Sequence, residues 1–195
     1  MTRTICCFLV LLFAGCAPMS SKRAEVLPAG YGKVILDAGG IETLSFTVVE
    51  QVTGKRVANV QGLEVVLPEG TYKFIIKTSL DDPLTLQDVT VIAGQVRPLQ
   101  VPVGQFLINV SLIGQGDQES QRVESARFTI YTYTFDRTLG KGTVYGTTAQ
   151  RFIAPVGTYK IGVYIPGSGE QVKVYEVEFG KPYVRNFEFQ AGSTE

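Results

Sequence analysis

An internal repeat is the feature that most constrains the fold of this chain, because it requires one folding unit to be built twice. The segments PEGTYK at 68–73 and PVGTYK at 155–160 lie 87 residues apart. Three further blocks keep the same order: FTV at 46–48 with FTI at 128–130, Gly94 with Gly180, and 96–101 with 184–189. Pro, Gly and Thr ahead of alternating apolar residues are typical of a turn that leads into a strand. The sequence therefore predicts two similar domains, at 30–102 and 103–191, joined almost without a linker.

Apolar residues alternate with polar ones inside each repeat, which indicates strands with one buried face. The series Tyr72, Phe74, Ile76 in the first repeat recurs as Tyr159, Ile161, Val163 in the second. No long stretch has helical periodicity, and Gly or Pro interrupts the chain about every ten residues. We therefore predict an all-β protein of two tandem immunoglobulin-like β-sandwich domains. Because each core would be small, we expect the two domains to pack directly against each other.

The first 15 residues have the features of a signal peptide. Arg3 precedes the apolar run 5–14, which is too short to cross a hydrocarbon layer of about 30 Å as a stable helix. The sequence FAGC at 13–16 resembles the lipobox of bacterial lipoproteins, in which two small residues precede a Cys that is lipidated. This resemblance implies that Cys16 carries diacylglycerol and becomes the mature N-terminus, although Phe13 stands where Leu is usual. The alternative is ordinary secretory cleavage beside an incidental Cys.

The cysteine count favours lipidation. Cys6 and Cys7 lie in the segment to be removed, so Cys16 alone remains and no internal disulfide can form. Acyl chains contribute about 0.8 kcal/mol per buried methylene, so several chains anchor a protein stably. By resemblance to enterobacterial sorting signals, Ala17 favours the outer membrane over the inner membrane. Residues 16–29 are then the lipidated Cys and a short tether, with a span of about 20 Å if it behaves as a coil.

The composition excludes several classes of function. The chain has no His, which removes the commonest general base and the commonest zinc ligand. Its 18 basic and 18 acidic side chains are interspersed, which gives no field suited to nucleic acid. The acidic groups Asp81, Asp82 and Asp88, and Asp117 with Glu119, lack the spacing of a calcium loop and are interpreted as turn residues. No nucleophile or phosphate-binding motif is present, so we predict no enzyme, cofactor, metal site or nucleic acid partner.

The sequence LPEGTYKF at 67–74, together with the segment through Gly94, resembles prealbumin-like sandwich modules. These include carboxypeptidase regulatory-like, collagen-adhesin B-type and PEGA-type domains, and 149–190 has the same features. The resemblance implies a stalk, spacer, adhesion or assembly role in a cell envelope. The adhesin relatives often contain an isopeptide crosslink between a Lys of the first strand and an Asn of the last. Lys33 and Asn186 occupy such positions, but each lacks its partner within its own repeat, so no crosslink is predicted.

The second repeat is longer than the first, and alignment places the extra residues at 114–125 and 136–148. Loops on a rigid sandwich commonly carry binding sites, so these two segments are candidate partner contacts. Neutral growth of surface loops is the alternative, because longer loops cost little stability.

An aromatic row is predicted between these segments. In the sequence RFTIYTYTF at 127–135, Phe128 and Ile130 align with inward positions, so Tyr131, Tyr133 and Phe135 should face outward. Such a row could contact a protein partner or stack against a glycan. Three alternatives stay open: the row packs against the first domain, it lies beneath a loop near Tyr145, or a bulge reverses the register.

Together these observations predict a non-catalytic, lipid-anchored envelope protein that serves as a structural or protein-docking module, in the periplasm or at the cell surface. Its partners would be the membrane and an envelope protein. The alternative is a carbohydrate-binding envelope lipoprotein that uses the aromatic strand face of the second domain.

Overall fold

The computed structural model describes residues 26–113, 121–146 and 149–190 of the chain. All regular structure in these residues is β-strand. The first unit contains β1 Tyr31–Asp37, β2 Leu44–Glu50, β3 Arg56–Gly62, β4 Glu64–Pro68, β5 Gly70–Ile76, β6 Leu84–Val91 and β7 Val96–Gln100. The second unit contains β8 Val103–Ile113, β9 Gln121–Arg122, β10 Ser125–Thr132, β11 Thr138–Tyr145, β12 Gln150–Pro155, β13 Gly157–Ile165, β14 Gly169–Val177 and β15 Pro182–Gln190. The prediction of an all-β protein is confirmed.

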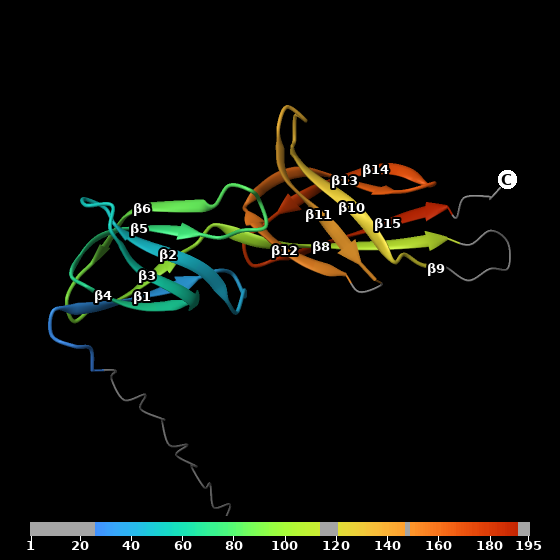
Figure 1. Ribbon diagram of the computed structural model, residues 1–195. Coiled ribbons are helices and arrows are strands. Elements are labelled where there is room, and N and C mark those ends of the chain that lie inside the picture. The colour runs from blue at the N-terminus through green and yellow to red at the C-terminus, as the bar shows by residue number, and fades with distance from the viewer. Residues whose placement is uncertain (1–25, 114–120, 147–148, 191–195) are drawn as a thin grey trace, which may run out of the picture.

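Each unit is a sandwich of two sheets, and the strand order is the same in both. The first unit combines β4-β1-β7 with β3-β2-β5-β6, and the second combines β12-β8-β15 with β11-β10-β13-β14. The short strand β9 adds to β8. β1 runs parallel to β7, and β8 runs parallel to β15 in the same way. The two predicted sandwiches are thus observed, and Figure 1 shows them one after the other along the length of the molecule.

The alternating pattern produces one hydrophobic core in each unit. In β5 the side chains of Tyr72, Phe74 and Ile76 are buried, and in β13 those of Tyr159, Ile161 and Val163 are buried. The second core is built around Tyr175, whose fully buried ring meets Phe106 edge-on at 5.5 Å between ring centroids. Phe128 and Ile130 are buried as the repeat predicted.

The repeated Gly-Thr-Tyr sequence has the same structural role in both units. The hydroxyl of Tyr72 donates to the carbonyl of Pro68 at 2.8 Å, and that of Tyr159 donates to the carbonyl of Pro155 at 2.8 Å. Burial raises the pKa of both hydroxyls, that of Tyr159 to about 12. Because the proline ends a strand of one sheet and the tyrosine lies in the other, each bond ties the two sheets of its sandwich together. We call these two contacts the tyrosine corners.

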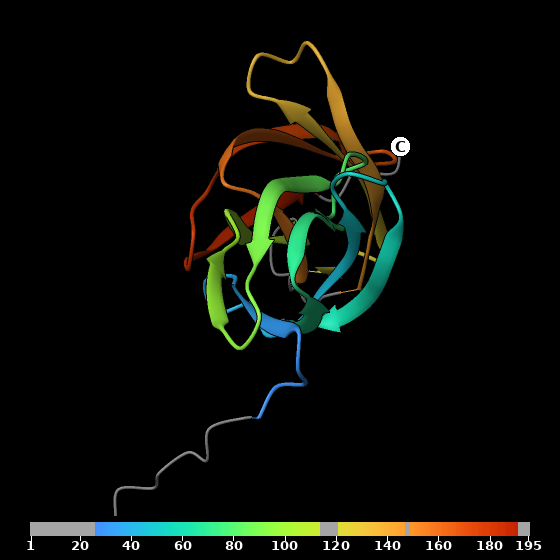
Figure 2. The ribbon, with the colours of Figure 1, turned by 90° about the vertical axis from the view of Figure 1, so that its left-hand side faces the viewer.

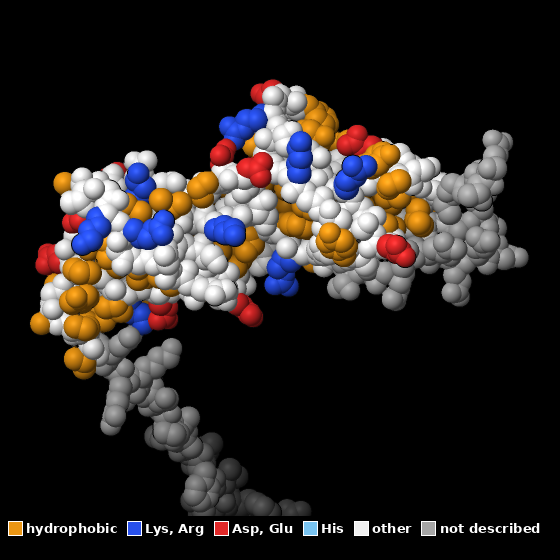
Figure 3. Space-filling model, in the orientation of Figure 1, with side chains coloured by type: hydrophobic (Ala, Val, Ile, Leu, Met, Phe, Trp, Pro, Cys, Tyr) orange, Lys and Arg blue, Asp and Glu red, His pale blue; other side chains and the backbone are white. Residues whose placement is uncertain are grey.

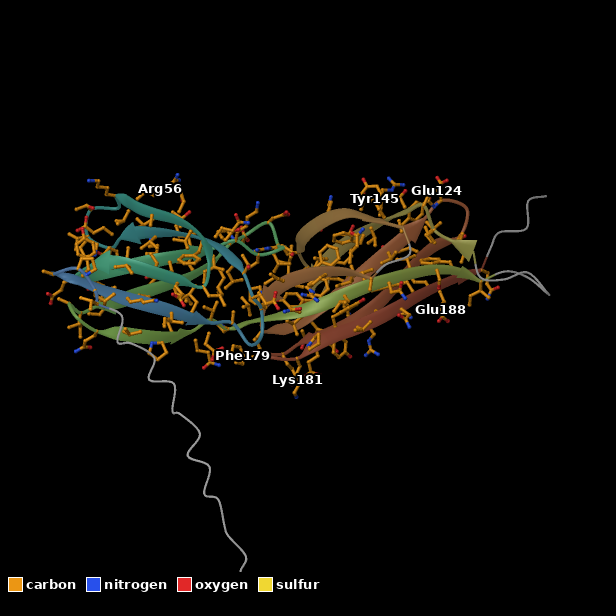
Figure 4. All side chains as sticks on the ribbon, turned by 90° about the horizontal axis from the view of Figure 1, so that it is seen from below. Arg56, Glu124, Tyr145, Phe179, Lys181 and Glu188 are labelled. Carbon is orange, nitrogen blue, oxygen red and sulfur yellow. The ribbon has the colours of Figure 1, made fainter. Side chains whose placement is uncertain are left out.

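The chain passes from one unit to the other without a linker. Val101 and Val103 are completely buried in the first core, and β8 begins at Val103 and continues into the second unit. Figure 4 shows Phe179 and Lys181 on the second unit where the units meet. At this junction the backbones come close, since a Cβ placed on Gly39 would collide with the backbone of Gly180.

The segment 77–83, which joins β5 to β6, crosses this junction. The amide of Ser79 donates to the carbonyl of Ile153 at 2.7 Å, and the amide of Ile153 donates to the Ser79 hydroxyl at 2.9 Å. Leu80 packs against the second core, whereas Ile153 packs against the first. The expected direct packing of the two units is therefore confirmed, and Figure 2, which looks along the molecule, shows the first unit directly in front of the second.

Candidate functional site

The three predicted aromatic residues lie near one another, but they do not form a strand face. β10 ends at Thr132, so Tyr133 and Phe135 belong to the turn between β10 and β11. Tyr131 is the last outward residue of β10 and is half-buried, while Tyr133 is 55% exposed and Phe135 is 46% exposed. Tyr133 and Phe135 are exposed as predicted, but the strand ends at Thr132 and does not continue to Phe135. We call Tyr131, Tyr133 and Phe135 the aromatic turn.

Polar contacts of Thr132 explain why the strand stops there. Its hydroxyl bonds to the Asp136 carboxylate, and it accepts a hydrogen bond from the amide of Arg137 at 3.3 Å. Hydrogen bonds from the hydroxyls of Thr132 and Thr134 lower the pKa of Asp136. Phe135 adopts a left-handed φ of +65°, which is uncommon for a residue with a side chain. Competition from local side-chain bonds thus ends a segment whose aromatic and β-branched residues favour strand.

Lys160, on the neighbouring strand β13, contacts two rings of the aromatic turn. The ammonium of Lys160 on β13 lies 4.3 Å from the ring centre of Phe135 and 4.9 Å from that of Tyr133. The rings of Tyr131 and Phe135 are 5.1 Å apart. Attraction between a cation and ring faces holds this arrangement at the surface, so the rings form a small preorganised patch.

The structure decides among the open alternatives for the aromatic residues. The pairing of β10 with β11 shifts register between Ile130 and Tyr131, but Ile130 stays fully buried, so this bulge does not reverse the faces. Tyr145 lies at the opposite end of β11 from the turn, near Glu124 (Figure 4), and does not cover the turn. The end of the turn does contact the first unit, because Arg137, the last residue before β11, pairs with Asp82.

The extra residues that the alignment placed at 136–148 lie at the end of that segment and not along all of it. Most of it is β11, which corresponds to β3 in the first unit. The turn before it is equally long in both units, since residues 133–137 match 51–55. Most of the extra length instead lies between β11 and β12, at 146–149, where the first unit has Leu63 alone. Residues 114–120, the core of the other predicted insertion, lie outside the described residues.

A shallow groove on the second unit was missed by sequence reasoning. It lies on the outer face of β11-β10-β13-β14 and has a volume of about 590 Å³. Its lining includes Arg127, Lys141, Gly162, Tyr164 and Glu170. The available signal was a difference between the repeats, because Gly162 stands where the first repeat has Ile75.

The remaining predicted site residues stand apart from this region. Lys33 is buried on β1 and forms an ion pair with Glu64 at 2.5 Å. Asn186 accepts a hydrogen bond from Asn109 at 3.1 Å. Asp81 and Asp82 lie in the junction segment, and no group of three potential metal ligands occurs within the described parts of the chain. Cys16 lies outside the described residues, and no helix in them is long and apolar enough to span a membrane.

No protein family and no curated protein matches the chain. Solved structures with a related fold include the minor pilin of Streptococcus agalactiae, with 8% identity, a TM-score of 0.41 and coverage of 86% of this chain and 98% of the pilin. The TIE protein of Bacillus anthracis has 19% identity and a TM-score of 0.37, and the alignment covers 83% of this chain and 34% of that protein. An adhesin-like protein of Bacteroides ovatus has 10% identity and a TM-score of 0.36, with 84% and 90% covered. This chain therefore spans about a third of the length of the TIE protein, and likeness at this level describes the fold alone.

Proposed function

We propose that this protein is a lipid-anchored component of the bacterial cell envelope that acts without catalysis, as a structural or protein-docking module. The observation that carries the proposal is the direction of the chain. β1 starts at Tyr31, at the end of the first unit away from the second, and β15 ends at the opposite end of the molecule (Figure 1). An anchor on Cys16 would therefore hold the first unit at the membrane and the second unit away from it.

Apolar side chains at the tether end support this orientation. Val26 is 93% exposed, and Val52, at the tip of the β2–β3 turn, is 90% exposed. Tyr31 and Ile92 are also exposed, and the amide of Gly94 donates to the carbonyl of Tyr31 at 2.8 Å, so these side chains share one end of the unit. Figure 3 shows hydrophobic side chains gathered at this end, where the chain enters the first unit. Exposed apolar tips of this kind suit the interfacial region of a bilayer.

The continuous junction supports a spacer role. The backbone of segment 77–83 forms hydrogen bonds with Leu139 of β11 and Ile153 of β12. Because of these bonds, the second unit would move with the first and would be held at a defined height above the membrane. The aromatic turn lies beside this junction rather than at the far tip, so a docked partner would contact the side of the molecule.

The anchor is tested by a Cys16→Ser variant. We expect the wild-type protein to partition into the detergent phase of membrane extracts and the variant to appear in the soluble fraction, because the acyl chains supply the stable membrane affinity. An Ala17→Asp variant tests the sorting prediction, since it should move the protein toward the inner membrane. Unchanged partitioning of the Cys16→Ser variant would show that Cys16 is not lipidated.

The docking role is tested by replacing both Tyr131 and Tyr133 with Ser. Crosslinking in native membranes should yield a defined adduct for the wild type and lose it in the double variant, while thermal unfolding changes little. Tyr145→Ser is the matched control, because Tyr145 is 65% exposed and lies at the other end of β11. Persistence of the adduct in the double variant, or failure of that variant to fold, would contradict docking through the aromatic turn.

A second candidate function is carbohydrate binding in the envelope by the same protein. The exposed rings of Tyr133 and Phe135 favour it, since aromatic faces present large apolar area at low entropic cost. Quenching of tyrosine fluorescence by soluble oligosaccharides would support glycan binding, whereas a crosslinked envelope protein would support docking.

A further inference from the structure

The groove on the second unit exists because the two repeats differ at a few outward positions of one sheet. On β5 the outward residue Ile75 pairs with Thr47 of β2, and on β13 the corresponding Gly162 pairs with Thr129 of β10. Along the same strands, Tyr164 corresponds to Lys77 by the repeat offset, and Arg127 faces Tyr164 in the pairing. A side chain that fills the face in the first unit is therefore missing from the second.

Tyr131 and Glu170 take the place of the missing side chain and cover the buried Gly162. A Cβ on Gly162 would lie 3.4 Å from the ring of Tyr131 and would collide with the carboxylate of Glu170. The groove itself runs across the four strands of the sheet, from Lys141 on β11 to Glu170 on β14. At the usual spacing between strands this is about 14 Å, which is long enough for a short oligosaccharide.

The groove is also open at one end, because the second unit has no long connection beside it. In the first unit the connection between β5 and β6, residues 77–83, borders the corresponding face and contributes Leu80 and Pro83 to its edge. In the second unit the connection between β13 and β14 is the short turn 166–168. The hollow of the first unit has a volume of about 340 Å³, compared with about 590 Å³ in the second.

The charges around the groove favour an anionic ligand. The guanidinium of Arg127 lies 4.9 Å from the centre of the Tyr164 ring, and this ring is 37% exposed. Lys141 adds a second exposed cation to the lining, and Glu170 is the single acid there. In Figure 3 basic side chains stand out over the region of β10 and β11. Arginine binds carboxylates through paired hydrogen bonds, and tyrosine rings stack on apolar ring faces.

We propose that this groove binds a saccharide that carries a carboxylate, with Arg127 and Lys141 at the acid group, Tyr164 against a sugar face, and Glu170 accepting a hydroxyl hydrogen bond. The proposal extends the second candidate function to residues outside the aromatic turn and does not depend on the anchor. A hexuronic acid and muramic acid offer the same combination of pyranose ring and carboxylate.

Titration calorimetry on the full mature chain in detergent micelles tests the proposal. The probes are tri-galacturonate, the disaccharide of N-acetylglucosamine and N-acetylmuramic acid, and neutral maltotriose. We expect at least one acidic saccharide to bind at least tenfold more tightly than maltotriose, and its affinity to fall with added salt because exposed charges are screened. Which acidic probe binds identifies the source of the carboxylate.

Two variants place the binding in the groove. Gly162→Ile introduces the residue of the first repeat and should weaken binding at least tenfold, because the side chain would displace the Glu170 carboxylate into the groove. Arg127→Gln should weaken binding of the acidic saccharide roughly tenfold to a hundredfold and leave maltotriose unaffected, since it removes a charge-assisted hydrogen bond. Lys77→Gln is the matched control on the corresponding face of the first unit and should change nothing.

The outcomes separate this proposal from the anchor. Circular dichroism establishes that each variant is folded, and Tyr164→Ser replaces Gly162→Ile if the latter does not fold. Unchanged acidic binding in the folded groove variants, equal binding of maltotriose, or no acidic binding at millimolar concentration would overturn the proposal. A failed anchor would alter membrane partitioning and leave these titrations as they are.

Discussion

The two units share a core and a strand order but differ on the outer face of one sheet. In the first unit the outer face of β3-β2-β5-β6 contains Ile75, and Thr47 donates to Asn59 at 2.8 Å across it. In the second unit Gly162 takes the place of Ile75, and Tyr164 and Arg127 line the groove beside it. The comparison teaches that the parts which stabilise the sandwich are kept in both repeats, whereas the parts that face solvent have diverged.

The junction explains how one copy could change without loss of the fold. The first unit supplies segment 77–83 to the interface, where its backbone bonds to Ile153 and Leu139 of the second unit. Leu80 enters the edge of the second core. Because the first unit supports the second, the outer face of the second unit is less constrained by stability than the shared core.

The largest effect is expected from equivalent core positions, and it tests whether the two units unfold together. Phe74 and Ile161 occupy the same repeat position, and both are completely buried. Phe74→Ala should cost about 3–5 kcal/mol and Ile161→Ala about 2–5 kcal/mol, because each leaves a cavity. Urea unfolding followed by hydrogen exchange in each unit measures the loss. We expect both units to lose protection together in either variant.

The control for this experiment is Val172→Ala, a substitution on the outer face of β14. Val172 is 44% exposed, so the change in unfolding free energy should stay within about 0.5 kcal/mol. If either core variant unfolded only its own unit and left the other with full protection, the two sandwiches would be independent and the junction would not couple them.

The fold could be predicted from the sequence because the internal repeat and the alternation of apolar and polar residues lead to the same assignment of strands. Tyr72 and Tyr159 recur with the same flanking Pro and Gly, and a period of two already assigns their faces. The same reasoning placed Phe128 and Ile130 inside correctly. The local pattern of apolar residues was sufficient to predict burial, because each strand of a β-sandwich buries one of its own two faces.

The candidate site was less predictable because it depends on contacts that pattern does not contain. The residue pattern predicts a strand through Phe135, but the hydrogen bonds of the Thr132 hydroxyl with the Asp136 carboxylate and the Arg137 amide end it earlier. The contact of the Lys160 ammonium with the rings depends on the pairing of β10 with β13, which brings together residues far apart in the chain. The groove depends on which strands pair and in what register, because its lining comes from four strands and includes Gly162 where the first unit has Ile75.

A smaller effect is expected at the tyrosine corners, where the two units can be compared by pH. Burial raises the pKa of Tyr159 from 10.0 to about 12 and also raises that of Tyr72. A raised pKa means that the folded state keeps its proton while the unfolded chain loses it. The stability from this group is therefore complete below pH 10 and is lost as the pH rises from 10 toward 12.

Tyr159→Phe and Tyr72→Phe separate the two corners. Each should cost about 1 kcal/mol at pH 7, because each removes one hydrogen bond to a proline carbonyl. Tyr159→Phe should also reduce the alkaline loss of stability, measured as the fall of the urea midpoint between pH 9 and pH 12. Burial raises the pKa of Tyr175 as well, so part of the slope should remain in that variant. An unchanged alkaline slope in Tyr159→Phe would contradict this assignment.

The smallest effect is expected from the ion pair that spans the junction, and it shows which contacts join the units. Arg137 and Asp82 are both largely exposed, with 61% and 74% of their side chains accessible. Exposed pairs contribute about 0.2–1 kcal/mol and are screened by salt, so Arg137→Ala should lower the unfolding free energy by less than about 1 kcal/mol. By contrast, Leu80→Ala at the same junction should cost more, since it removes apolar contact with the second core. Urea unfolding at low and high salt measures both variants. If Arg137→Ala were the more damaging, charge rather than apolar packing and backbone hydrogen bonds would hold the two units together.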